Sequence, residues 1–173
     1  MKLTGEQKIK APRDIVFAAL NDPEILKESI PGCRSLNKLS KTEFEAEVGL
    51  KIGPVKATFT GAVKLSKLKP PESYTITGEG KGGTAGHAKG GADVKLTEDG
   101  EHTVLAYDVD AQVGGKLAQI GSRLIDSSAK KLAGQFFKKF GKIVESGREP
   151  EDGDDGDGKK SLWGRLKSSV GGS

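Results

Sequence analysis

The 173-residue chain contains one cysteine, Cys33, and two histidines, so it has few of the side chains that bind metals or act as nucleophiles. A single cysteine cannot form an intrachain disulfide, which fits a reducing compartment. Metal sites need several converging donors, and neither His87 nor His102 has a cluster of such residues at ligand spacing. We therefore expect no catalytic constellation, no metal site and no tightly bound cofactor.

Aromatic residues are also scarce, at 5% of the chain, and they are not interleaved with the 28 basic residues. Proteins that bind single-stranded nucleic acids stack bases on such rings, so the composition argues against nucleic-acid binding. No apolar run approaches the length of a membrane span or of a secretory signal. We expect a cytoplasmic protein whose contact with the inner face of the cell membrane is peripheral.

Most of the chain alternates apolar and polar residues in runs that end at turn residues such as Asp99-Gly100, a strong hairpin signal. Each run gives a strand with one apolar and one polar face, as in an antiparallel sheet covered on one side. The carboxylates of these runs should face solvent. The expected strands cover residues 2–9, 36–39, 43–52, 55–68, 73–81, 84–98 and 102–113.

Helices are predicted on both sides of this series of strands. Pro12 begins a first short helix, and Asn21-Asp22-Pro23 separates it from a second one that ends at Ser29. From Leu117 to Val144 apolar residues recur in steps of four or eight, which predicts one amphipathic helix of about 40 Å. The order predicts an α+β domain over residues 1–146, with a curved antiparallel sheet around a long C-terminal helix.

The last 27 residues divide into a linker and a tail of opposite charge. Residues 147–158 are glycine-rich, and within them Glu149 to Asp157 hold six acids and no base, which predicts a flexible, charge-extended linker. Residues 159–173 predict a basic amphipathic helix too short to span a bilayer, which would lie on a membrane surface. A protein partner, or no specific role, remains open. The candidate membrane-binding residues are Lys159, Lys160, Leu162, Trp163, Arg165, Leu166, Lys167 and Val170.

Residues 11–26, followed by Ile30-Pro31-Gly32-Cys33, resemble the opening signature of the CoxG family of carbon monoxide dehydrogenase subunits. Residues 53–57 and 78–92 are also similar to that family. The resemblance implies a helix-grip fold of the START and Bet v 1-like (SRPBCC) superfamily. It also implies a non-catalytic accessory protein of molybdenum-containing carbon monoxide dehydrogenases or related hydroxylases. Such a protein would help attach the enzyme to the membrane and handle its quinone acceptor.

The glycine-rich residues 78–91 lack the Gly-Lys-Ser/Thr sequence that ends a P-loop, and no helix follows them. They therefore indicate a hairpin of small side chains. Small residues such as Ala85 and Gly86 would leave space beneath the long helix, unless the helix moves closer to the sheet. The resemblance favours a cavity for a lipophilic molecule, with the isoprenoid tail of a quinone as the expected ligand. The candidate lining residues are Phe17, Leu50, Phe59, Val63, Tyr74, Ile76, Val94, Leu124, Leu132 and Phe136.

Two alternatives to a ligand carrier and membrane adaptor stay open. The domain could be an assembly factor with a closed cavity that binds its partner enzyme through its surface. It could also be a small helix-grip enzyme, a cyclase or a hydrolase, because fold does not fix function. An enzyme should place ionisable groups in its cavity, and the expected outward direction of the strand carboxylates counts against that alternative.

Overall fold

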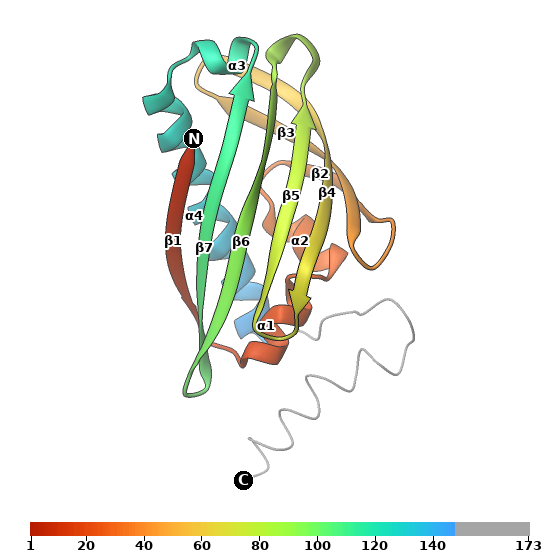
Figure 1. Ribbon diagram of the computed structural model, residues 1–173, viewed down its shortest axis with the longest axis vertical. Helices are drawn as coiled ribbons and strands as arrows, with labels where there is room; N and C mark the ends of the chain where they lie inside the picture. The colour runs from red at the N-terminus through yellow and green to blue at the C-terminus, as the bar shows by residue number, and fades with distance from the viewer. Residues whose placement is uncertain (148–173) are drawn as a thin grey trace.

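The computed structural model describes residues 1–147, and Figure 1 shows that they form a curved sheet with helices on its concave side. The sheet has seven strands in the order β1-β7-β6-β5-β4-β3-β2, and every neighbouring pair is antiparallel. This is the predicted α+β helix-grip architecture. The basic tail, and the acidic linker beyond Gly147, lie outside the described residues.

The strands follow the predicted alternation closely. Their bounds are β1 Lys2–Ile9, β2 Cys33–Lys38, β3 Glu43–Ile52, β4 Val55–Lys69, β5 Ser73–Lys81, β6 His87–Asp99 and β7 His102–Gly114. β3 and β5 have the predicted bounds. β6 begins three residues later than predicted, because Gly83–Ala85 forms a 3-10 turn, η1, between β5 and β6.

Two short helices connect β1 to β2 at one end of the sheet. α1 spans Arg13–Ala19 after Pro12, and α2 spans Pro23–Ser29. The buried carboxylate of Asp22 caps α2 by accepting hydrogen bonds from the backbone N–H groups of Glu24 (2.9 Å) and Ile25 (3.3 Å). This cap explains why the chain starts a second helix immediately after the first.

The predicted helix from Leu117 to Val144 is two helices. α3 spans Lys116–Gln119 and α4 spans Ser122–Glu145. Gly121 separates them with a φ of 98°, a left-handed conformation that an apolar repeat does not reveal. α4 then crosses the concave side of the sheet, and its C-terminal half packs against α2 (Figure 1).

The interior contains two separate groups of buried apolar residues. The larger group joins α1, α2 and the C-terminal half of α4 to the sheet, and its members include Ile15, Leu96, Leu105, Phe140 and Val144. The smaller group lies at the other end and consists of Phe59, Ala85, Leu117 and Ile125. The stretch of sheet between the two groups is where the sequence places its smallest side chains.

Candidate functional site

A band of small residues crosses the concave face of the sheet opposite α4. The strand register aligns Ala46, Gly61, Gly80 and Ala88 in one row across β3, β4, β5 and β6. All four residues are half-buried. They share a face with Phe44, Leu65 and other members of the larger core, so the row faces the interior of the domain.

No described side chain packs closely over two residues of this row. A Cβ atom built on Gly61 would lie 3.6 Å from the backbone oxygen of Glu79 and 4.0 Å from that of Ala46. A Cβ atom on Gly80 would meet only the backbone oxygen of Thr60, at 4.0 Å. Apart from chain neighbours, no described side chain lies within 4 Å of either position. Because protein interiors are normally close-packed, this is room that a ligand could fill.

A groove opens beside α4. Its volume is about 630 Å³, and it lies between the first half of α4, the β3–β4 hairpin and the Pro31-Gly32 turn. Leu50 lines the groove and shares the inner face of β3 with Ala46, four residues away, or about 13 Å along the strand. The groove residues are Pro31, Gly32, Gly49, Leu50, Lys51, Gly53, Leu124, Ser127, Ser128, Lys131, Leu132 and Gln135.

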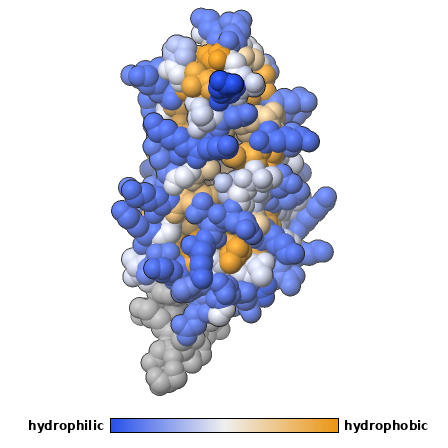
Figure 2. All heavy atoms as spheres, turned by 90° about the vertical axis from the view of Figure 1, so that its left-hand side faces the viewer, coloured by the Kyte–Doolittle hydropathy of each residue, from blue (hydrophilic) through white to orange (hydrophobic). Residues whose placement is uncertain are grey.

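The opposite side of the domain, where β1 and α4 are neighbours, is bridged by aromatic rings. Tyr107 of β7 lies over Gly5 of β1 and stacks on Phe137 of α4 with ring centroids 5.4 Å apart. Figure 2 shows this side, with hydrophobic atoms in separate groups between hydrophilic side chains. These rings cover the sheet on this side of the domain.

The ten candidate lining residues occupy three kinds of position. Leu50, Leu124 and Leu132 line the groove. Val63, Ile76 and Phe136 are half-buried beside the larger core. The other four are buried: Phe59 belongs to the smaller core, and the larger core contains Phe17, Tyr74 and Val94.

Two of these buried residues contact each other edge to face, since the Phe17 and Tyr74 rings lie 5.4 Å apart. They consolidate the packed end of the domain. The role of all ten as ligand contacts stays a prediction.

The predicted location of the space, beneath Ala85 and Gly86, is wrong. Ala85 is buried in the smaller core, and a Cβ atom on Gly86 would lie 3.1 Å from Leu117 and still closer to the backbone of Gly114. Gly86 also has a φ of 118°, so its lack of a side chain serves a close backbone approach. The open positions are Gly61 and Gly80, and the alternation of β4 already placed Gly61 on the apolar face.

Titratable groups do not form a reactive cluster in the part of the chain that the structure describes. Within residues 1–147 no group of three His, Cys, Asp or Glu residues could hold a metal ion. Cys33 is half-buried at the start of β2, and burial raises the pKa of its thiol. Burial likewise raises the pKa of the fully buried Tyr74 hydroxyl. Both shifts keep these groups neutral near pH 7, as expected of structural residues.

Solved structures place the fold in a broad class. A START superfamily protein from Mycobacterium smegmatis is 13% identical, with a TM-score of 0.65, over 84% of this chain and 97% of that one. The protein Ara h 8.0201 is 17% identical, with a TM-score of 0.61, over 84% of this chain and 98% of that one. The described residues therefore have the START/Bet v 1-like helix-grip fold.

Within that class the family is clear. The family model for the carbon monoxide dehydrogenase subunit CoxG matches residues 5–144, so the chain belongs to the CoxG family. A conserved protein from Geobacillus kaustophilus is 33% identical, with a TM-score of 0.80, over 84% of this chain and 96% of that one. A search of curated proteins found no match to the chain. Family membership implies an accessory role beside a carbon monoxide dehydrogenase.

Proposed function

We propose that this protein carries an isoprenoid quinone in its helix-grip domain and links a carbon monoxide dehydrogenase-type molybdenum hydroxylase to the membrane. Family membership supports the accessory role and the partner enzyme. In this role the protein is not an enzyme. Its place is the cytoplasmic side of the membrane, to which it attaches peripherally.

The observation that carries the ligand proposal is the open row at Gly61 and Gly80 beside the groove. In a close-packed domain, side chains normally cover such positions, whereas no described side chain lies over Gly61 or Gly80. A ligand carrier needs space of this kind. The groove volume of about 630 Å³ is within the range of small-molecule sites. A glycine and alanine row has no polar side chain, so it suits a flexible hydrocarbon tail.

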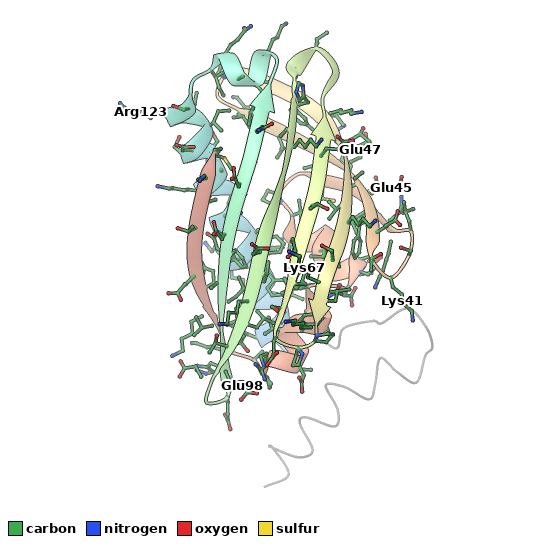
Figure 3. The ribbon with its side chains drawn as sticks, in the orientation of Figure 1. Lys41, Glu45, Glu47, Lys67, Glu98 and Arg123 are labelled. Carbon is green, nitrogen blue, oxygen red and sulfur yellow. The ribbon has the colours of Figure 1, made fainter. Side chains whose placement is uncertain are left out.

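The directions of the carboxylates support a non-catalytic role. Glu45 and Glu47 extend from β3 away from the interior (Figure 3), and Asp108 and Asp110 of β7 are exposed. The residues that line the groove include no carboxylate, histidine or cysteine. Histidine and carboxylates are the most common general acids and bases, and Ser127 and Ser128 have neither beside them in the groove to activate a hydroxyl.

The membrane link is assigned to the tail, residues 159–173. None of the described helices is both long and apolar enough to cross a bilayer. In the tail, Leu162, Trp163, Leu166 and Val170 would share one face of a helix, and basic residues would flank them. Partial burial of these apolar groups together with attraction to anionic lipid supports reversible attachment.

The ligand proposal is tested by a substitution that adds a large side chain to the row of small residues. The full chain is purified from its own host, analysed by native mass spectrometry and extracted with organic solvent, with quinone expected in the extract. Gly61→Leu should remove most of the bound quinone, because the new side chain projects into the open space. Ala62→Leu is the matched control, since Ala62 is exposed on the opposite face of β4.

Equal quinone content in the two variants would contradict the proposed ligand position. A wild-type protein without any quinone, which also fails to bind added menaquinone-4 in detergent, would favour the alternative of an adaptor that carries no ligand. Thermal unfolding of both variants verifies that each one is folded before its quinone content is compared.

A further inference from the structure

We propose that the groove beside α4 is the surface by which the folded domain docks on an anionic phospholipid bilayer, with Lys51 and Lys131 contacting lipid phosphates. This inference rests on the proposed function, because a carrier of a lipophilic ligand must meet the lipid phase that supplies it. It assigns to the domain itself a membrane contact that is separate from the tail.

The first argument is the charge of the groove. Two lysines and no acid line it: Lys131 belongs to α4, and Lys51 lies at the edge of β3, where its side chain alternates with the inward Leu50 and so extends from the outer rim of the groove. Both lysines are exposed, and neither forms an ion pair with a described residue. Ser128 and Gln135 add further hydrogen-bond donors to the same lining. The groove therefore presents positive charge and donors, the complement of a phosphate.

A hollow on the convex face provides the contrast. Its volume is about 680 Å³, similar to that of the groove, and it lies over β5, β6, β7 and the end of β4. It too contains lysines, among them Lys69 and Lys95, but Asp93 and Asp108 lie beside them. The groove therefore differs from the hollow not in its lysines but in the absence of any carboxylate from its lining.

The positive charge of the groove continues along α4. The basic residues of this helix are all exposed, and its two acids are the half-buried Asp126 and the exposed Glu145 at its C-terminal end. Glu145 accepts a hydrogen bond of 3.0 Å from the backbone N–H of Lys10. Arg123 extends from the first turn of α4 into solvent (Figure 3). The basic residues are Arg123, Lys130, Lys131, Lys138, Lys139 and Lys142.

The second argument is an exposed leucine at the rim of the groove. Leu124 is 37% exposed, and its side chain lies over Gly53 in the β3–β4 turn. The other large exposed hydrophobic residues of the described chain, Leu39 and Leu68, do not line the groove. An apolar side chain surrounded by lysines is the usual composition of a peripheral membrane contact. Leu124 would enter the headgroup region while the lysines remain at its surface.

A bilayer explains this surface better than an acidic protein partner does. The groove reaches the inner face of β3 at Leu50, about 13 Å along the strand from the row that contains Gly61, and a ligand bound over the row would enter from this side. A groove that faces the bilayer lets an apolar molecule enter without crossing water, which avoids the unfavourable exposure of its hydrocarbon. An acidic protein would satisfy the lysines but would cover the opening.

The test compares two charge reversals in the full-length protein. Lys51→Glu with Lys131→Glu changes the groove, and Lys69→Glu with Lys95→Glu changes the convex hollow by the same net charge. Vesicles of three parts phosphatidylcholine to one part phosphatidylglycerol are used in a flotation assay. The groove pair should bind at least about 30-fold more weakly than wild type, since each lysine near an anionic leaflet is worth about fivefold. The convex pair should bind within about twofold of wild type, because it stays beyond the screening distance.

A second pair isolates the apolar contact. Leu124→Ser should weaken binding to pure phosphatidylcholine vesicles as well as to anionic ones, because it removes the inserted side chain. Leu39→Ser is the control, since Leu39 is even more exposed, at 58%, but lies away from the groove. The tail is unchanged in all four variants, so it contributes equally to each.

Three results would overturn the inference. Equal losses for the two charge pairs would show that only net charge matters, and no loss for either would show that the tail alone binds lipid. Weaker capture of the dehydrogenase by the groove pair, with vesicle binding unchanged, would assign the surface to an acidic protein. Menaquinone-4 binding in detergent is measured in parallel. If wild type binds none but the groove pair still controls flotation, the quinone proposal fails and the docking surface stands.

Discussion

The two halves of the concave side differ in how completely α4 covers the sheet. At the α1–α2 end, Phe140 and Val144 are 0% and 1% exposed, and Phe140 stacks on Phe136 with ring centroids 5.5 Å apart. In the middle of the sheet, Gly61 and Gly80 have no side chain above them within 4 Å, chain neighbours aside. One helix and one sheet thus form a packed end and an open region. The region is packed where the side chains are large and open where they are glycine or alanine.

Because of this difference, the packed end contributes most of the folding stability, and the open region is available for binding. The packed end contains most of the large buried side chains, together with the buried Thr103, whose hydroxyl donates a 2.7 Å hydrogen bond to the backbone oxygen of Ala11. The open region contains glycines and alanines, whose burial contributes little to the free energy of folding. A domain divided in this way can leave space for a ligand without losing its main core.

The largest expected effect is at the packed end. Phe140→Ala should lower the free energy of unfolding by about 3–5 kcal/mol, because it removes a fully buried ring from a site that cannot collapse. Phe59→Ala should cost less, near or below the lower end of that range. Phe59 belongs to the smaller core beside the open region, where neighbours can relax. Urea unfolding measures both, and equal losses would argue against two distinct regions.

The second largest expected effect on stability distinguishes glycines that leave space from glycines at which neighbouring backbone leaves no room for a side chain. Gly90→Ala should destabilise the domain by about 1–3 kcal/mol, because its Cβ would lie 2.6 Å from the Cα of Ala111 and closer still to the backbone oxygen of Asp110. Gly80→Ala should change the stability by less than about 0.5 kcal/mol or raise it slightly. Thermal unfolding of the two single variants tests this. A large loss for Gly80→Ala would show that the row is already filled.

The sequence predicted the strands well because their signals are local. Alternation and turn residues define β3 and β5 within a few neighbouring residues, so their bounds agreed with the structure. The outward direction of Glu45 and Glu47 followed from the same alternation. The antiparallel sheet and the covering helix then followed from the order of elements.

The position of the open space could not be predicted in the same way. It depends on how seven strands align and on where α4 crosses them, and both are long-range properties. Ala85 and Gly86 are as small as the alanines and glycines of the row, yet Leu117 and Gly114 pack against this pair. The break at Gly121 was missed for a related reason, since a positive φ leaves no mark on apolar spacing.

A smaller effect concerns Cys33, which lies next to Gly32 at the edge of the groove. Burial raises the pKa of its thiol, so at pH 8 the folded protein holds less reactive thiolate than the unfolded chain does. Alkylation by iodoacetamide should therefore be about 3- to 10-fold slower in buffer than in urea, and it should speed up as the pH rises toward 10. A native rate equal to or above the unfolded rate would show a thiolate stabilised by a nearby positive charge.

The smallest expected effect is that of removing everything after Gly147. Both regions of the domain are built from residues 1–147, and α4 already ends with a capped turn in which the N–H of Gly147 bonds the oxygen of Val144 at 3.3 Å. The acidic linker has too few apolar residues to cover the sheet. The melting temperature of the truncated chain should therefore stay within about 2 °C of that of the full chain, which corresponds to less than about 1 kcal/mol. A calorimetric scan of both proteins at one concentration measures the difference. A drop of many degrees would mean that the tail packs against the domain.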